Sequence, residues 1–253
     1  MQSVSDWAAI IAAGGNLGGE LRDATGKNNK ALVQFGGRCS GDIVIEACLQ
    51  AGIPEVVVVA GEDVKDNLAL SNEVKFAEPG HNAIRSARSG VDVVGTNRPL
   101  LLLAADLPLL TAPSVREFVH HSEGIQGFTA GLIRSEVLQT AYPGVPASYV
   151  RLREGRFVAA SIYGATRDAF DRALVTLEAA NANRKSQLKL ALKLGFGNLL
   201  QYVLGLATFA TAERAVERAF DAPVRLIPHA LPETAMDFDN LEDLRYIQDF
   251  LSR

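Results

Sequence analysis

The chain has 253 residues, of which 48% are hydrophobic and 21% charged, as is typical of a globular domain with a sizeable core. Its formal net charge of −4 argues against nucleic acid as a main partner, because binding a phosphate backbone requires a basic surface. The two cysteines have no metal or disulfide spacing, and neither a signal peptide nor a membrane-spanning apolar run is recognisable. We therefore expect a cytoplasmic protein with reduced thiols.

The first half of the chain alternates between strand-like and helix-like segments. Short apolar runs predict buried strands at Trp7–Ala12, Glu55–Ala60, Val74–Ala77 and Pro99–Ala104. Helices are predicted between and after them at Asp42–Ala51, Val64–Leu70, Asn82–Ser89 and Ala112–Ser122. This alternation predicts an α/β, Rossmann-like fold, with a mostly parallel sheet covered by helices on both faces.

The pattern changes in the second half. A hairpin is predicted to turn at Glu154-Gly155, followed by a largely helical stretch. We interpret residues 166–220 as a helical insertion within a single domain that spans residues 1–253. A strand at Val224–Pro228 and a strand-turn-helix in "TAMDFDNLEDLRYIQDFL" are expected to close the domain.

A glycine-rich stretch, "AAGGNLGGELRDATGKNNK", follows the first predicted strand and is expected to be a long flexible loop. Glycine lets backbone N–H groups approach a phosphate closely, although a plain connector would have the same composition. The Rossmann fingerprint fails because Asn16 and Leu17 stand where it requires glycine, and Leu21 and Asn28 break the Walker A pattern. The stretch therefore indicates another kind of nucleotide loop.

Four motifs in order resemble those of the MobA-like NTP transferase family, which has a GT-A-type fold. They are "AAGG" with its loop, Lys30 with "ALVQFGGR", "LLLAADLPLLTAPSV", and "MDFDNLEDL". The resemblance covers nearly the whole chain, and its middle segments are similar to an uncharacterised branch of that family. It implies a nucleotidyltransferase that uses Mg²⁺ to transfer NMP from an NTP to a phosphorylated acceptor, such as a sugar phosphate, with release of pyrophosphate.

The resemblance also assigns roles to residues. Lys30 and Asp106 are the implied catalytic residues. Asp106 and Asp239 are the implied Mg²⁺ ligands, with Asp237 as a further candidate, because Mg²⁺ takes one or two carboxylates plus substrate phosphates. The implied nucleotide-binding residues are Ala12, Ala13, Gly14, Gly15, Asn16, Lys30, Gly80 and Asn82. Arg184 and Lys185 match a pair in the related branch and are implied to bind substrate.

Each main assignment has a plain structural alternative. Asp106 could cap the next helix, and Asp237 or Asp239 could cap the helix that begins near Leu241. Lys27 is the rival of Lys30 for the phosphate-binding role. An alternating strand would put Asp237 and Asp239 on the same face, so that either could reach a metal.

Two departures from the related branch bear on function. Val158-Ala159-Ala160-Ser161 stands where that branch has threonine-glycine-glycine-asparagine, which narrows the space for an acceptor. Asn29 replaces the proline that most relatives have before the loop lysine. The alternatives to the transferase are a GT-A glycosyltransferase, which has the same fold and uses a nucleotide-sugar, and a non-catalytic nucleotide-binding regulator, which the Ala159-Ala160 departure suggests.

The basic, apolar segment at residues 184–209 has three interpretations. Lys185, Lys189 and Lys193 are four residues apart and share one helix face. We favour a helical subdomain that packs on the sheet. A peripheral contact with a lipid-linked substrate or membrane, and a homodimer contact, are the alternatives.

Overall fold

The structure is a computed structural model that describes residues 3–95, 97–181 and 207–253. The strands of the main sheet are β1 (Ala8–Ala12), β4 (Glu55–Val59), β5 (Lys75–Ala77), β6 (Leu100–Ala104), β7 (Phe128–Arg134), β8 (Val150–Leu152), β9 (Gly155–Ala165) and β10 (Val224–Ile227). A separate small hairpin consists of β2 (Gln34–Phe35) and β3 (Arg38–Cys39).

Helices connect these strands. The α-helices are α1 (Gly19–Thr25), α2 (Ser40–Ala51), α3 (Glu62–Lys65), α4 (Ala83–Val93), α5 (Ala112–Ser122), α6 (Ser135–Ala141), α7 (Arg167–Asn181), α10 (Phe209–Phe220) and α11 (Leu241–Leu251). The short 3₁₀ helices are η1 (Val4–Asp6), η2 (Lys30–Leu32), η3 (Ser71–Glu73) and η4 (Pro232–Ala235). Among the described helices, none has the length and apolar character needed to cross a bilayer.

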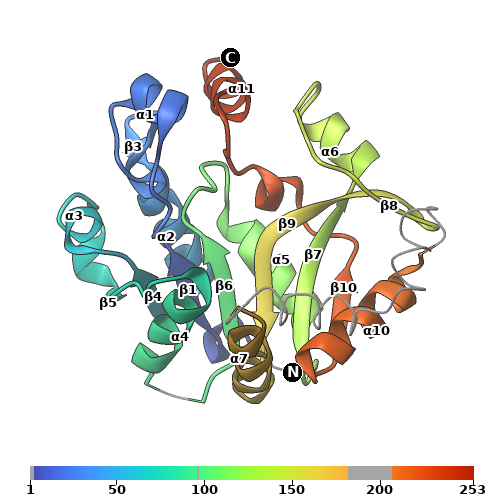
Figure 1. Cartoon of the computed structure of the whole chain (residues 1–253). Coiled ribbons are helices and arrows are strands. Elements are labelled where there is room, and N and C mark those ends of the chain that lie inside the picture. Colours follow the sequence, from blue (N-terminus) through green and yellow to red (C-terminus); the bar gives the residue numbers. More distant parts are fainter. Residues whose placement is uncertain (1–2, 96, 182–206) are drawn as a thin grey trace.

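The described strands form a sheet in the order β10-β7-β9-β6-β1-β4-β5, and β8 adds to β9 (Figure 1). Strands β6, β1, β4 and β5 run parallel, as do β7 and β10, whereas β9 is antiparallel to both of its neighbours β6 and β7. Because β1 lies in the parallel half next to β6, the loops that follow these two strands emerge at the same edge of the sheet.

Helices cover both faces of the sheet, so the central strands are buried on both sides. Ala9 and Ile11 of β1 belong to a large core with α2 and α5, whereas Ala8 and Ile10 belong to a second core with α4 and α7. Figure 1 shows α4 and α7 together in front of the sheet. The predicted mostly parallel α/β fold with helices on both faces is confirmed.

Most predicted elements are present, with shifted ends. The helix expected at Val64–Leu70 is wrong in extent, because α3 ends at Lys65 and the Asp42 carboxylate accepts hydrogen bonds from the backbone N–H groups of Ala69 and Leu70. The hairpin turns one residue earlier than expected, since Leu152 pairs with Gly155. Helices α7 and α10 lie within the predicted insertion, while residues 182–206 lie outside the described part of the chain.

The strand expected in "TAMDFDN" is also absent: η4 is followed by residues that pair with no strand. The alternation that predicted it is nevertheless real, because Met236 and Phe238 are buried. They are buried by tertiary packing, with the Phe238 ring 5.3 Å from that of Phe35, and not by strand partners.

The glycine-rich stretch is more ordered than expected, because it contains α1 and is closed at its base. The backbone N–H of Leu17 donates to the carbonyl of Asn28 at 2.8 Å, and the backbone N–H of Lys30 donates to the carbonyl of Gly15 at 2.9 Å. Asn29 is 3% exposed, and its side chain joins both sides of the base: its amide nitrogen donates to the Ala13 carbonyl and its oxygen accepts from the Ala31 N–H, both at 2.8 Å. Asn29 therefore fixes the backbone on either side of Lys30.

We expect Asn29→Ala to lower the free energy of unfolding by about 1–3 kcal/mol, because a buried carbonyl and a buried N–H lose their partner. Asn28→Ala is the matched control, since Asn28 is exposed and its replacement should change stability by less than about 0.5 kcal/mol. Urea denaturation followed by circular dichroism measures both values. Equal losses in the two variants would contradict the role assigned to the Asn29 amide.

Candidate functional site

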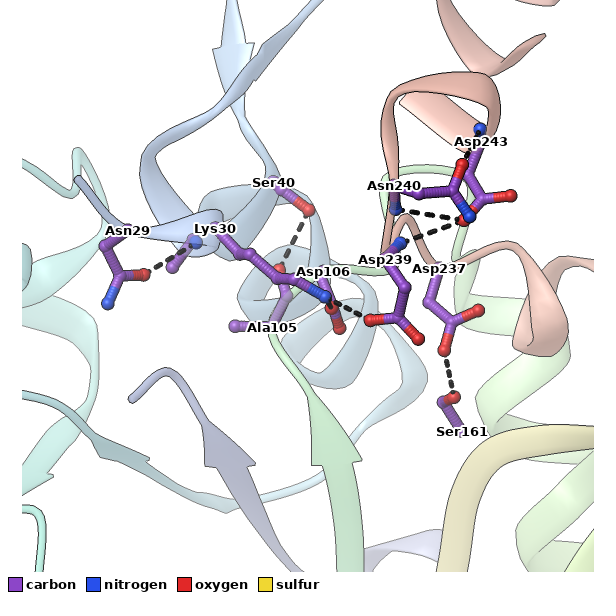
Figure 2. A network of polar contacts seen from close by, with 11 residues as sticks. Asn29, Lys30, Ser40, Ala105, Asp106, Ser161, Asp237, Asp239, Asn240 and Asp243 are labelled. Carbon is purple, nitrogen blue, oxygen red and sulfur yellow. Dashed lines mark hydrogen bonds and ion pairs between the residues drawn. The ribbon is translucent and has the colours of Figure 1, made fainter. Parts of the chain in front are cut away.

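A lysine and two aspartates from distant parts of the chain meet at the edge of the sheet where β1 and β6 end. The Lys30 Nζ atom lies 2.7 Å from Asp106 Oδ2 and 2.5 Å from Asp239 Oδ1 (Figure 2). The side chains of Lys30 and Asp106 are 17% and 12% exposed, whereas that of Asp239 is 77% exposed. We call these residues the Lys30 cluster.

Lys30 is the first residue of η2, and its charge is well stabilised. Its ammonium also lies 5.6 Å from the centre of the Phe238 ring. Partial burial lowers the pKa of Lys30, but the neighbouring Asp106 and Asp239 carboxylates more than offset this effect, so the pKa lies above its ordinary value. The side chain is therefore an ammonium throughout the physiological pH range.

Asp106 follows the central strand β6, as predicted, and is held by its neighbour in sequence. The Ala105 N–H donates to the Ala12 carbonyl at 3.0 Å, and the buried Ser40 hydroxyl donates to the Ala105 carbonyl at 2.8 Å. Helix α5 is capped by Thr111, whose hydroxyl accepts from the Ser114 N–H. The alternative that Asp106 caps this helix is therefore excluded.

Neither Asp237 nor Asp239 caps α11. The cap is Asn240, whose side chain accepts from the N–H groups of Glu242 and Asp243. The Asp243 carboxylate in turn accepts from the N–H groups of Asp239 and Asn240 at 3.0 and 3.2 Å. This capping box fixes the Asp239 backbone and leaves the Asp239 side chain to contact Lys30.

Asp237 points to a different partner from that of Asp239, as Figure 2 shows. The Ser161 hydroxyl of β9 donates to Asp237 Oδ2 at 2.7 Å. Burial raises the pKa of the Asp237 carboxyl, the Ser161 hydrogen bond lowers it, and the nearby Asp106 and Asp239 charges raise it, with a net increase. Asp237 therefore lies next to the Lys30 cluster without contacting its ammonium.

A cavity of about 520 Å³ opens on one side of the Lys30 cluster. Its lining contains most of the residues predicted to bind nucleotide, namely Ala12, Ala13, Gly14, Gly15, Lys30, Gly80 and Asn82, together with Asp106. Asn16 does not line it. The wall also includes Pro79, His81 and Ser86.

Gly14 and Gly80 both line this cavity, but their surroundings differ. A Cβ atom at Gly14 would meet no other atom within 4 Å, so the absence of a side chain leaves open space there. A Cβ at Gly80 would lie 2.4 Å from Arg85 Cβ, so packing against α4 itself requires glycine. Asn82 caps α4, with its side-chain oxygen accepting from the Arg85 N–H at 2.9 Å.

A second cavity, of about 510 Å³, lies on the other side of the cluster. It is lined by Asp237, Asp239 and Val158-Ala159-Ala160-Ser161, the segment that differs from the related branch. Ser148, Tyr163 and Tyr246 also line it, and the described lining includes no lysine, arginine or histidine. Since Lys30 and Asp106 belong to the first cavity and Asp239 to the second, the ion pair between Lys30 and Asp239 spans the junction.

The donor set at this junction fits Mg²⁺ better than a metal held by protein alone. In the described ranges, no group of three or more histidine, cysteine, aspartate or glutamate side chains is arranged to hold a metal. Asp106 and Asp239 nevertheless converge closely enough to share one ammonium. Mg²⁺ commonly takes one or two carboxylates and completes its coordination with water and substrate phosphates.

Three contributors to the site were not predicted: the Asn29 amide, the Ser40 hydroxyl and the Ser161 hydroxyl. A capping-box pattern, Asn240 followed three residues later by Asp243, was visible in the sequence and could have assigned the helix cap. Arg184 and Lys185 lie outside the described residues, so their predicted role stays a prediction. The described end of that segment packs inward, with the Phe209 ring 5.0 Å from that of Phe157.

Comparison with known proteins identifies the family and the fold of the chain. The MobA-like NTP transferase domain family matches residues 8–136. A structure described as a hypothetical transferase from Thermus thermophilus is 26% identical, with a TM-score of 0.81 over 94% of this chain and 98% of that chain. No curated protein matches the sequence.

More distant solved structures share the fold. A nucleotidyl transferase from Methanothermobacter thermautotrophicus is 18% identical, with a TM-score of 0.61 over 98% of both chains. The 2-C-methyl-D-erythritol 4-phosphate cytidylyltransferase of Thermus thermophilus is 16% identical, with a TM-score of 0.55 over 97% of this chain and 98% of that chain. The family match covers half of the chain and identifies it as a member of the MobA-like NTP transferase domain family, and so as an enzyme of the nucleotidyltransferase class.

Proposed function

We propose that this protein transfers the nucleotidyl group of an NTP to a phosphorylated small-molecule acceptor, with Mg²⁺ and with release of pyrophosphate. The observation that carries the proposal is the position of the Lys30 cluster at the junction of two cavities. A transfer between two substrates needs a charged centre that both can reach. The first cavity holds the glycine-rich loop and is the proposed nucleotide site, and the second is the proposed acceptor site.

In the proposed reaction, an oxygen of the acceptor phosphate attacks the α-phosphorus of the NTP. The bond from that phosphorus to the oxygen bridging to the β-phosphate breaks, and pyrophosphate leaves. Backbone N–H groups at Gly14 and Gly15 approach the phosphates, and the Lys30 ammonium stabilises negative charge on the phosphate oxygens. Asp106 and Asp239 would hold Mg²⁺, which when bound supplies further positive charge to the phosphates.

The charge distribution supports an acceptor that presents its phosphate at the junction. The described lining of the second cavity has no cationic side chain, but Asp239 of that lining contacts the Lys30 ammonium. Beside its apolar side chains, the lining contains aspartates and hydroxyl-bearing residues, which suit an acceptor body that carries hydrogen-bond donors. Ala159 and Ala160 occupy part of its wall and narrow the acceptor space relative to the glycines of the related branch.

The first test is a thermal-shift screen of the four NTPs with and without Mg²⁺, followed by an assay of pyrophosphate release with candidate acceptors. A nucleotide at a hundredfold excess over its Kd stabilises the protein by about 2.7 kcal/mol. Release of a nucleoside diphosphate from a nucleotide-sugar would favour the glycosyltransferase alternative. Tight NTP binding without turnover of any acceptor would favour the regulator.

Asp106→Asn is expected to abolish Mg²⁺-dependent turnover while the fold is retained. The substitution keeps the size of the side chain but removes the charge that attracts the cation. Pyrophosphate release by the purified variant, with circular dichroism as a check on folding, measures the effect. Turnover at the wild-type rate would show that Asp106 is not a metal ligand.

Lys30→Ala is expected to lower kcat by about 10²–10³-fold, as is typical for loss of one electrostatic contact in a transition state. Lys27→Ala is the matched control, because Lys27 belongs to the same loop but not to the cluster, and it should retain nearly full activity. Steady-state kinetics of both variants provides the comparison. The opposite ranking would transfer the phosphate-binding role to Lys27.

A further inference from the structure

The ammonium group of Lys30 lies between the two carboxylates that the proposed function assigns to Mg²⁺. It contacts Asp106 at 2.7 Å and Asp239 at 2.5 Å, so it already acts as their shared counter-ion (Figure 2). A divalent cation that entered between these carboxylates would meet this positive charge within a few ångströms. Like charges at such a distance repel strongly in a partly buried site.

We propose that Lys30 makes this site selective for a metal–nucleotide complex over a free divalent cation, because the ammonium must leave the carboxylates before a metal can bind them. This inference rests on the proposed function. The triphosphate of a nucleotide offers the ammonium a second set of anionic partners in the first cavity. Nucleotide binding therefore draws Lys30 away from Asp106 and Asp239 and frees both carboxylates for the metal.

The surroundings of Lys30 allow this exchange through the side chain alone. Asn29 and the hydrogen bond from the Lys30 N–H to the Gly15 carbonyl hold the backbone in place. The stem of the lysine runs past Gly15, where a Cβ atom would lie 3.4 Å from the Lys30 Cδ atom. Both Lys30 and Gly15 line the first cavity, so the ammonium is on a flexible stem beside the proposed phosphate site.

The competition from Lys30 is built into the free protein, because its ammonium is in ion-pair contact with both carboxylates. The metal therefore gains access only when Lys30 has other partners. Because coupling between two binding sites is reciprocal, the metal must also strengthen nucleotide binding by the same factor.

The proposal is tested with Mn²⁺ alone, titrated into the full-length protein and followed by the electron paramagnetic resonance signal of the free ion. Wild type is expected to bind Mn²⁺ weakly. Lys30→Met should bind it at least about 10-fold more tightly, a factor within the usual range of coupling between sites. Lys27→Met loses the same charge outside the cluster and should behave as wild type, whereas Lys30→Met with Asp106→Asn should lose the gain.

A second readout covers the case in which Lys30→Met folds poorly. Two unpaired carboxylates destabilise this variant, so Mn²⁺ should raise its thermal midpoint while leaving that of wild type almost unchanged. Lys30→Gln keeps a polar group of similar length and should change in the same direction. Circular dichroism confirms that the variants compared are folded.

The outcomes separate this inference from the function on which it rests. Equal Mn²⁺ affinity in wild type and Lys30→Met would overturn the selectivity role, provided that Asp106→Asn weakens Mn²⁺-dependent nucleotide binding. If Asp106→Asn leaves that binding unchanged, the metal assignment of the proposed function fails as well. A gain of free Mn²⁺ binding in Lys30→Met that requires Asp106 supports the inference.

Discussion

The ion pairs of Lys30 with Asp106 and Asp239 are the interaction on which the arrangement of this site depends. The two aspartates lie 76 and 209 residues from the lysine in the sequence, and each carboxylate follows a different element. Without a cation between them, their like charges would repel. The ammonium therefore joins the glycine-rich loop, the end of β6 and the start of α11 into one charged centre at the junction of the two cavities.

Side-chain hydrogen bonds fix the backbone beside each charged residue of the cluster. The charged side chains themselves take no part in these hydrogen bonds. Asn29 ties down the backbone next to Lys30, Ser40 binds the carbonyl of Ala105 beside Asp106, and the Asp243 carboxylate binds the N–H of Asp239. All of these supports are hydrogen bonds between a side chain and the backbone. This division permits an exchange of ionic partners at the centre without rearrangement of the fold, because the bonds that hold the elements are not those that a ligand would break.

The parallel half of the sheet was predictable because its strands are buried on both faces, which produces continuous apolar runs. The same reasoning wrongly predicted a strand before Asp239. Phe238 is buried there by tertiary contact, and a local pattern does not distinguish such burial from strand pairing. The end of α3 depends on Asp42, which is distant in sequence. For the site, the rule that ligands gather at the carboxyl ends of strands placed Asp106 near the glycine-rich loop. The contact of Lys30 with both aspartates could not be predicted in this way. It depends on the distances between elements, and a local sequence pattern carries no information about them.

The nature of the cation is as important as its position. An arginine would present a rigid, planar fork that binds a carboxylate through two parallel hydrogen bonds, and this ion pair would be harder to break. A lysine presents a compact charge on a flexible stem, and its three donors are not bound to one geometry. Since the Lys30 stem lies beside the bare backbone of Gly15 and faces the first cavity, a change of partner needs only rotation of its own side chain. Under the proposed function, the centre holds two carboxylates together in the free protein and contacts phosphate in the complex, and lysine suits this exchange better than arginine.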